Sequence, residues 1–181
     1  KYTGKFETCA LDAISETSGT SVRNSITFPN TREGRQAMIY LATHREPVVY
    51  RTVDLAIIDR ERDRALFIGK DVHEGLISFM GGFDNKKGQT DEEAVMKELG
   101  EELPGLLISE LRKLDSLPVD DPRYRKSNDG IKTTMFVTDF LGGAFSAGDD
   151  ANYYRWCARG EFMGLLVPWH RPLGDLLLHH W

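Results

Sequence analysis

The sequence predicts an α/β protein in which a mixed β-sheet lies between helices. Several short runs rich in β-branched and other apolar residues lie on either side of one strongly helical segment. A second amphipathic segment lies near the C-terminus. This order of strands, helix, strands and helix is typical of a sheet packed by helices on its faces.

Five apolar runs are predicted to be β-strands, because each is short and bounded by polar or glycine-containing turns. They cover residues 48–58, 64–69, 76–80, 106–117 and 133–140. Helices are expected over 91–103 and 173–180, and in the second one Leu173, Leu176 and Leu177 share one side.

The N-terminal part of the chain has a different composition from the rest. Residues 1–30 are rich in Thr, Ser and Gly, and we expect them to be irregular or weakly stranded. A helix is expected over 31–44, because the residues from Asn30 to Glu33 resemble a capping box and Pro47 follows. We therefore predict an N-terminal extension over 1–45 and one folded domain over 46–181.

The composition limits the classes of partner. The chain has 181 residues and a net charge of -5, with no basic stripe, so we expect no nucleic-acid partner. No apolar run approaches the roughly 20 residues that span a bilayer, so no membrane partner is expected. No signal peptide is visible, and Cys9 and Cys157 are interpreted as free thiols. These observations favour a cytoplasmic or organelle-matrix location.

The predicted helix over 91–103 carries the first candidate site. Thr90 begins a capping box, and Pro104-Gly105 ends the helix. Glu98, Glu101 and Glu102 are spaced i, i+3 and i+4, so they share one face. Carboxylates so placed repel one another, and Mg²⁺ prefers hard oxygen ligands of this kind. The alternative is a solvated acidic helix face.

The context of this helix favours the metal site. A glycine pair ends a strand before the helix, and residues 81–106 read GGFDNKKGQTDEEAVMKELGEELPGL. This segment resembles the signature of the Nudix hydrolase family, most closely over KELGEE. The resemblance implies an α/β/α sandwich with a mixed sheet between helices. It also implies a Mg²⁺ ion, with Mn²⁺ as an alternative, held by Glu98, Glu101, Glu102 and the Gly82 carbonyl.

The segment departs from the family pattern at three places. Gln89 stands where the family has its first Glu, after a loop that is longer by one residue. Lys97 replaces an Arg, which keeps the charge but loses the bidentate fork. Pro104 stands where Gly is usual. The change at Gln89 motivates an alternative function, a nucleotide sensor that hydrolyses its ligand poorly.

Elements after the helix indicate which Nudix group the chain resembles. The runs VDDPR from Val119, TT from Thr133 and AGDDA from Ala147 are similar in order and spacing to the ADP-ribose pyrophosphatase group. The likeness covers about residues 50–160. It implies ligand contacts from Arg123, Thr133, Asp149 and the exposed aromatic Phe83, and a catalytic role for Asp150. The alternative for each acidic run is an ordinary turn.

The resemblance implies Mg²⁺-dependent hydrolysis of ADP-ribose, or a related nucleoside diphosphate, to AMP and ribose 5-phosphate. A water attacks one phosphorus, and its base is Glu101, Glu102 or an acid of Asp149-Asp150. Other substrates left open are NADH, a nucleotide sugar and a dinucleoside polyphosphate. The expected partner is a small nucleotide, and a homodimer is an option. Asp54, on the strand before the glycine pair, is a further candidate polar contact.

Overall fold

The computed structural model describes residues 9–17, 20–28, 31–33, 36, 48–83, 88–125, 129–149 and 151–181. The chain divides into two compact units, Lys1–Pro47 and Val48–Trp181. The prediction of an extension over 1–45 and a domain over 46–181 stays a prediction. In the described residues no helix is long and apolar enough to cross a membrane.

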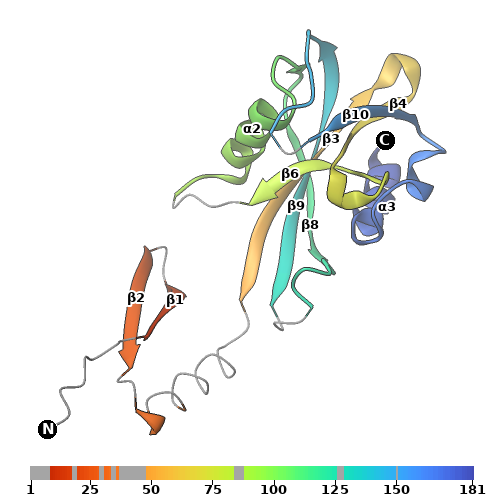
Figure 1. Cartoon of the computed structure of the whole chain (residues 1–181). Helices are drawn as coiled ribbons and strands as arrows, with labels where there is room; N and C mark the ends of the chain where they lie inside the picture. The colour runs from red at the N-terminus through yellow and green to blue at the C-terminus, as the bar shows by residue number, and fades with distance from the viewer. Residues whose placement is uncertain are drawn as a thin grey trace, which may run out of the picture. The chain divides into compact units, whose positions relative to one another are not determined.

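The first unit contains an antiparallel pair of strands, β1 (Cys9–Thr17) and β2 (Thr20–Phe28), with Cys9 opposite Phe28 (Figure 1). This pair is more regular than the irregular or weakly stranded segment that we expected. Of the predicted helix over 31–44, Arg32, Glu33 and Gln36 are described and are helical. Thr31 is described as a bend, and the remaining residues of that prediction lie outside the described part of the chain.

The second unit is built on one mixed sheet with the central order β10-β4-β3-β9-β7. In addition, β5 pairs with β4, β6 with β3 and β8 with β9. The central neighbours β3 and β9 are parallel, and the other pairs are antiparallel. The strands are β3 (Val49–Asp59), β4 (Arg64–Gly69), β5 (Ile77–Ser78), β6 (Met80–Phe83), β7 (Leu107–Ile108), β8 (Arg112–Val119), β9 (Gly130–Gly142) and β10 (Tyr153–Ala158).

Two helices lie on opposite faces of this sheet, α2 (Asp91–Glu102) and α3 (Arg171–His180) (Figure 1). Alternate residues of β3 enter two separate cores, because successive side chains of a strand point to opposite faces. Leu55 packs in a core with Leu99 of α2, whereas Ala56 packs in a core with Leu173 of α3. The α/β/α sandwich with a mixed sheet is confirmed.

Four short 3-10 helices complete the second unit. They are η1 (Arg60–Arg62), η2 (Asp71–His73), η3 (Phe162–Gly164) and η4 (Pro168–His170).

The prediction of one continuous strand over 106–117 is wrong. It is divided into β7 and β8, and the pairing of each with β9 shifts register. Between them the Ser109 hydroxyl accepts the Asp139 N–H, and the Thr138 hydroxyl donates to the carbonyls of Ser109 and Glu110. Side-chain hydrogen bonds thus replace the regular ladder at this point. The strand β10 was not among the five predicted runs.

The start of α2 is attached to the sheet by its first residue. The predicted capping box is present, with Thr90 and Glu93 each accepting the other's backbone N–H. Asp91 is buried and accepts from Arg51 of β3 at 2.6 Å and from Lys113 of β8 at 3.0 Å. Burial alone raises the pKa of Asp91, but its hydrogen bonds and these two cations hold the pKa below the usual value. The helix is therefore anchored by charge as well as by its apolar side.

Replacing Asp91 with Ala should lower the free energy of unfolding by about 1–2 kcal/mol, since two charge-assisted hydrogen bonds are lost while both cations stay solvated. Urea unfolding at pH 7 measures this loss. Asp175→Ala, at an exposed position of α3, is the matched control and should leave the stability unchanged. Equal stability of the two variants would contradict the anchoring role.

Candidate active site

The predicted carboxylates of α2 differ strongly in their exposure. Glu98 and Glu102 are buried, at 9% and 1% exposed, while the Glu101 side chain is 46% exposed. A solvated acidic face would leave all three in water. Two buried carboxylates on one helix need compensating charge, because an unpaired buried charge costs several kcal/mol.

Lys97 compensates two of the three carboxylates. Its ammonium lies 2.9 Å from Glu98 Oε1 and 2.5 Å from Glu101 Oε2. Hydrogen bonds to Glu101 and then to Glu98 raise the pKa of Lys97 well above its usual value. The lysine therefore joins Glu98 and Glu101 with a single positive charge.

Glu102 is held from two other elements of the fold. Lys70, just after β4, places its ammonium 2.7 Å from Oε1, and the Gly81 N–H of β6 donates to Oε2 at 2.9 Å. The Lys70 side chain is 18% exposed, so the pair is mostly buried. Sequence reasoning missed Lys70. No sequence pattern marks it, since it is one charged residue that follows a buried strand.

The two glycines before the helix leave room for these carboxylates. A Cβ atom at Gly82 would lie 2.4 Å from Glu98 Oε2, and one at Gly81 would lie 2.1 Å from the Val53 carbonyl oxygen. Both distances are shorter than any real carbon contact, so a larger residue forces the strand or the helix to shift. The Gly82 backbone and the Glu98 carboxylate therefore lie against each other.

The donor set suits a hard divalent cation, because it consists of carboxylate oxygens beside a backbone carbonyl. In the described part of the chain, however, no three acidic, His or Cys side chains converge on one point. The physical reason is that Lys97 and Lys70 hold the carboxylates in two groups. The positive charge beside these carboxylates comes from the ammonium groups of Lys97 and Lys70.

A second buried polar group lies on the α3 face of the sheet, around Asp54. Thr133 is fully buried and donates its hydroxyl to Asp54 Oδ2 at 2.5 Å. Burial raises the pKa of Asp54 to about 8; Glu102 also raises it, while the Thr133 hydrogen bond and Lys70 oppose the shift. His170 Nε2 lies 3.9 Å from Asp54 Oδ1, and burial is the main cause that lowers the pKa of His170 to about 3. Thr133 therefore orients Asp54 rather than pointing to solvent.

Arg123 is oriented by its neighbour in the DDPR run. Its guanidinium binds both carboxylate oxygens of Asp121, at 2.6–3.1 Å, and Asp121 also accepts the Arg123 backbone N–H. Burial acts to raise the pKa of Asp121, but these bonds bring it below the usual value. The Arg123 side chain is 69% exposed, so it presents a fixed cation at the surface.

Phe83 is half-buried and belongs to a group of three rings. Its ring centroid lies 6.3 Å from that of Tyr50 and 6.4 Å from that of Tyr124, and the two tyrosine rings are 5.1 Å apart. The sequence pointed to Phe83 alone, because Tyr50 and Tyr124 lie on other elements and have no shared spacing.

The loop of the AGDD run lies against the C-terminal end of α2. The Gly148 N–H donates to the Glu102 carbonyl at 2.9 Å, and Asp149 is exposed with a left-handed φ of 48°. Asp149 is thus close in space to the helix of the carboxylates. Asp150 lies outside the described residues.

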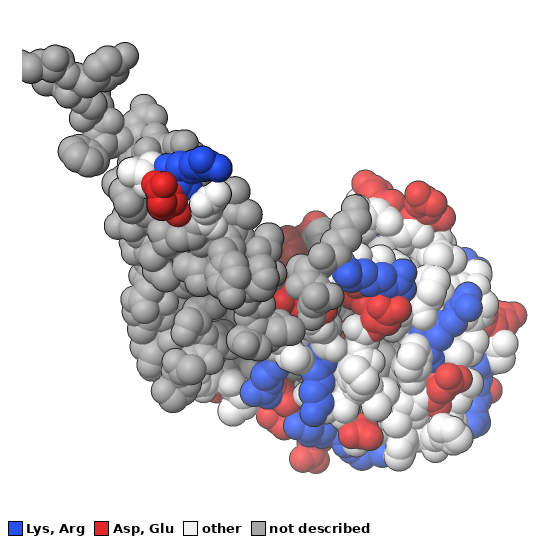
Figure 2. Space-filling model, turned by 90° about the horizontal axis from the view of Figure 1, so that it is seen from below, with Lys and Arg blue, Asp and Glu red and all other residues white. Residues whose placement is uncertain are grey.

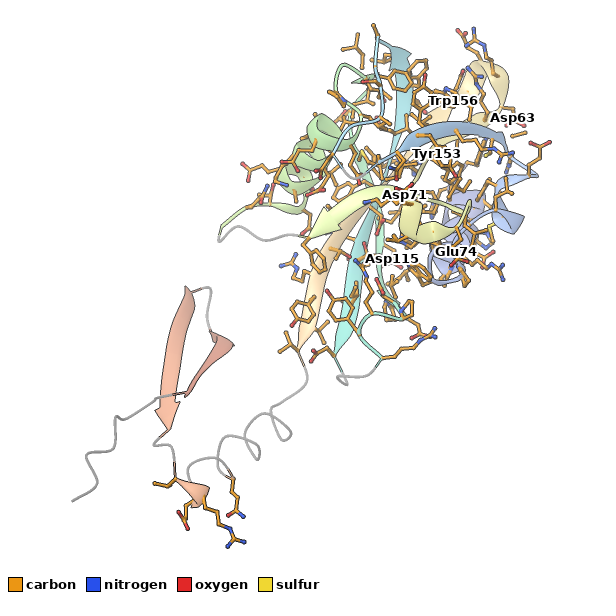
Figure 3. All side chains as sticks on the ribbon, viewed as in Figure 1. Asp63, Asp71, Glu74, Asp115, Tyr153 and Trp156 are labelled. Carbon is orange, nitrogen blue, oxygen red and sulfur yellow. The ribbon has the colours of Figure 1, made fainter. Side chains whose placement is uncertain are left out.

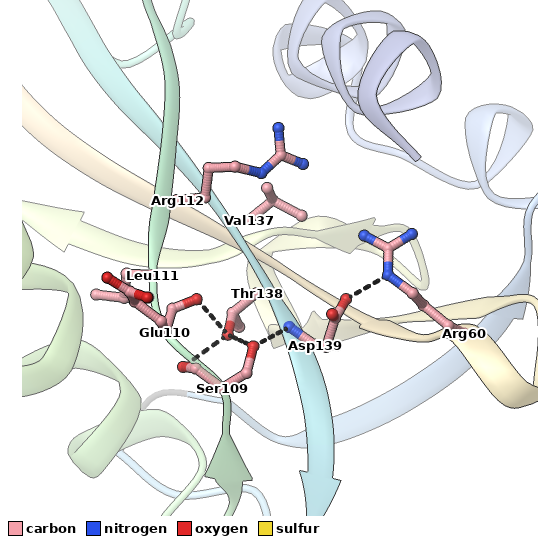
Figure 4. Close-up of a pocket in the computed structure, with 8 residues that line it drawn as sticks. All are labelled: Arg60, Ser109, Glu110, Leu111, Arg112, Val137, Thr138 and Asp139. Atoms are coloured by element: carbon pink, nitrogen blue, oxygen red, sulfur yellow. Dashed lines mark hydrogen bonds and ion pairs between the residues drawn. The ribbon is translucent and has the colours of Figure 1, made fainter.

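Other features lie away from these groups. A cavity of about 380 Å³ is lined by Arg60, Ser109, Glu110, Leu111, Arg112, Val137, Thr138 and Asp139, and it includes none of the predicted site residues (Figure 4). Trp156 lies on β10 with the Arg64 guanidinium 4.5 Å from its ring centre (Figure 3). The face in Figure 2 carries both signs of charge interspersed.

No family model matches the chain. An ADP-ribose pyrophosphatase of Methanocaldococcus jannaschii is 38% identical over 80 residues, which are 43% of this chain and 43% of that protein. The match therefore spans less than half of the relative. It relates a segment of this chain to that pyrophosphatase.

Solved structures share the fold at low identity. The dihydroneopterin triphosphate pyrophosphohydrolase of E. coli has a TM-score of 0.58 at 14% identity, with 74% of this chain and 99% of that one covered. The Nudix domain of Shewanella oneidensis NrtR, complexed with ADP ribose, has a TM-score of 0.58 at 14% identity, covering 79% and 97%. A bifunctional NMN adenylyltransferase/ADP ribose pyrophosphatase of Francisella tularensis, complexed with AMP and Mn, has a TM-score of 0.53 at 21% identity, covering 80% and 45%.

Replacing Lys70 with Met should lower the free energy of unfolding by about 3 kcal/mol at pH 7, because Glu102 loses its buried counter-charge. The double variant Lys70→Met/Glu102→Gln should lose clearly less than the sum of the two single changes. Chemical unfolding of the four proteins measures this coupling. Lys132→Met, at an exposed position of β9, is the control. Additive losses would contradict the ion pair.

Asp54 makes the stability depend on pH in a defined direction. Its pKa is raised in the folded chain, so the folded state keeps a proton that the unfolded state releases. The contribution to stability is therefore complete below pH 3.8 and is lost as the pH rises through the window up to about 8. Asp54→Asn should flatten the fall in unfolding free energy across this window. If the unfolding free energies of the variant and the wild type changed in parallel with pH, the role of Asp54 would be contradicted.

Proposed function

We propose that this chain, which has the fold of a Nudix domain, hydrolyses the pyrophosphate bond of ADP-ribose to AMP and ribose 5-phosphate with a divalent cation. The observation that carries the proposal is the set of three carboxylates of Glu98, Glu101 and Glu102, which share two lysines; the Glu98 carboxylate also lies against Gly82. A buried carboxylate without a cationic partner destabilises the folded state. Buried carboxylates of this kind therefore favour a functional site that binds a cation. The related segment of an ADP-ribose pyrophosphatase supports the choice of substrate.

Glu98, Glu101, Glu102 and the Gly82 carbonyl would hold Mg²⁺, with Mn²⁺ as an alternative. When bound, the cation supplies positive charge to the phosphate oxygens and lowers the pKa of a water. The Arg123 guanidinium is preoriented by Asp121 and exposed, which suits planar recognition of a phosphate. Asp149, in the loop near the end of α2, and Asp150, which follows it in the sequence, would position the water or the terminal ribose.

Among the candidate bases, the geometry favours Glu101. Its side chain is 46% exposed and one of its oxygens is bonded to Lys97, so it reaches water. Glu102 is 1% exposed, and its two oxygens are bonded to Lys70 and to the Gly81 N–H. A base must lie within hydrogen-bond reach of the water that it activates. Thr133 would act through Asp54, and Phe83 would contact the ligand directly.

A second candidate function is a nucleotide-binding module that hydrolyses its ligand poorly. Gln89 and the separation of the three carboxylates by lysines favour it. The purified chain should be incubated with ADP-ribose and Mg²⁺ or Mn²⁺, and AMP release measured with and without a chelator. NADH, a nucleotide sugar and a dinucleoside polyphosphate, assayed in parallel, test the substrate. Tight ADP-ribose binding without AMP release at several pH values would contradict the enzyme proposal and support the nucleotide-binding module.

Glu101→Gln should lower kcat by at least about 100-fold, the scale on which the loss of one preorganised charge slows an enzyme. The free energy of unfolding should stay close to that of the wild type, because Glu101 is partly solvated. Glu102→Gln should lose both turnover and stability, because it also breaks the buried pair.

Glu92→Gln is the matched control, since Glu92 is an exposed residue in the first turn of the same helix. Steady-state kinetics and thermal melting of the three variants measure both effects. Near-normal turnover of Glu101→Gln and Glu102→Gln would mean that the catalytic site lies elsewhere.

A further inference from the structure

The cavity of about 380 Å³ around Val137 and Asp139 has two arginine side chains in its lining, Arg60 and Arg112, and we call it the arginine cavity. Arg112 of β8 is directly opposite Val137 of β9, so both side chains lie on the face of the sheet that packs with α3. In Figure 4 both guanidinium groups and the Val137 side chain lie on the same side of β9. Two cations therefore border one cavity.

Each guanidinium is oriented by a single contact. Arg60 Nε donates to Asp139 Oδ1 at 2.7 Å, and Arg112 Nη2 donates to the carbonyl oxygen of His180, in α3, at 3.4 Å. A guanidinium has five N–H donors in one fixed plane. Among the described residues neither guanidinium makes a further hydrogen bond, so most of these donors are available to an added group.

The charges beside the two arginines do not cancel. Arg60 is paired with Asp139, and the side chains of this pair are 49% and 42% exposed. Arg112, by contrast, forms no ion pair with any residue in the described part of the chain. Glu110 also lines the cavity, but its carboxylate points away from both guanidinium groups (Figure 4). One positive charge thus stays uncompensated at the cavity.

The direction of Glu110 follows from the break between β7 and β8. A regular ladder continued from the pair of Arg112 and Val137 would place Glu110 opposite Asp139, with two carboxylates on one face. Instead Ser109 pairs with Asp139. The Ser109 N–H donates to the Asp139 carbonyl at 2.9 Å, and the Ser109 hydroxyl accepts the Asp139 N–H at 3.0 Å.

The pairing then resumes at Ile108 with Phe140, so three residues of one strand, 109–111, span two residues of β9. An extra residue of this kind is a β-bulge, which re-aims the side chains beside it. Here it takes the Glu110 carboxylate away from the arginines, so the break in the strand keeps the arginine side of the cavity positive.

The size and lining of the arginine cavity indicate the class of ligand. Pockets for small organic molecules begin at roughly 300 Å³, so this cavity holds more than a single ion. The planar fork of a guanidinium matches the oxygens of a carboxylate or a phosphate. Val137 is 2% exposed and belongs to the apolar core beneath α3, so it adds an apolar surface. The cavity therefore suits an oxyanion carried on a small apolar body.

We propose that the arginine cavity binds a small organic oxyanion, a carboxylate or a phosphate monoester, whose oxygens accept hydrogen bonds from Arg60 and Arg112. The inference goes beyond the proposed function, because none of the lining residues belongs to the α2 carboxylates or to their lysines. The ligand of this cavity is a second molecule, bound independently of the nucleotide.

Three probes of similar size test this inference on the whole chain, with a chelator present so that no divalent cation takes part. Benzoate and phenyl phosphate share an aromatic ring and differ in the oxyanion, while benzyl alcohol carries no charge. Titrations followed by backbone amide NMR should show saturable shifts at residues 109–112 and 137–139 with one or both anions and none with benzyl alcohol. The anion that binds more tightly identifies the headgroup.

Arg112→Gln and Arg60→Gln should each weaken binding of that anion by about 10-fold, the scale of one lost hydrogen bond to a charged group. Arg155→Gln is the matched control, because Arg155 is an exposed arginine of β10 outside the cavity lining, and it should bind like the wild type. Thermal melting of each variant separates loss of binding from loss of folding. If Arg60→Gln does not fold, Arg112→Gln decides alone.

Four results would overturn the inference. They are the absence of saturable shifts at the cavity with either anion, equal binding of benzyl alcohol and benzoate there, equal affinity of Arg112→Gln and the wild type, and shifts confined to amides near Gly82 and Arg123. The last result would assign the anion to the candidate active site. Because no turnover is measured, each outcome is independent of whether the chain hydrolyses ADP-ribose.

Discussion

A carboxylate that is removed from water must meet positive charge or hydrogen-bond donors, and the arrangement of this molecule depends on how Glu102 meets that requirement. Glu102 is 1% exposed, and its partners are Lys70, directly after β4, and Gly81 of β6. One side chain thus ties the end of α2 to two strands. The next residue of β6, Gly82, lies against the Glu98 carboxylate, where a Cβ atom would not fit.

The same requirement explains why the acidic residues near the site are not equivalent. Burial raises the pKa of Asp54 to about 8, and the hydrogen bond from Thr133 only partly opposes this rise. Asp121 has the Arg123 guanidinium, so its pKa falls. Among Glu98, Glu101 and Glu102, Glu101 has the most exposed side chain, at 46%, so it is the one of the three in contact with water. The burial of each acidic residue and the group that it contacts, rather than its residue type, thus determine whether its role is structural or chemical.

Local sequence patterns were sufficient to predict helix α2 and the helix face that carries the three carboxylates. The Thr90 capping box and the spacing of Glu98, Glu101 and Glu102 are properties of adjacent turns. The order of elements predicted a mixed sheet packed by helices, and the resemblance to the Nudix family implied the sandwich. Contacts between distant residues were not predictable in this way. Lys70 is 32 positions from Glu102, and the neighbouring rings of Tyr50, Phe83 and Tyr124 come from three separate elements. The break within 106–117 was also missed, because side-chain hydrogen bonds from Ser109 and Thr138 override the strand pattern.

The most direct measurement is the anomalous scattering of crystals grown with Mn²⁺ and compared with crystals grown without it. The account predicts one strong peak within coordination distance of Glu98, Glu101, Glu102 and the Gly82 carbonyl oxygen. It also predicts that the Lys97 ammonium has moved away from the two carboxylates that it bridges without the ion. A peak at another place, or no peak with Lys97 still bound to both carboxylates, would contradict the assignment of this helix face as the cation site.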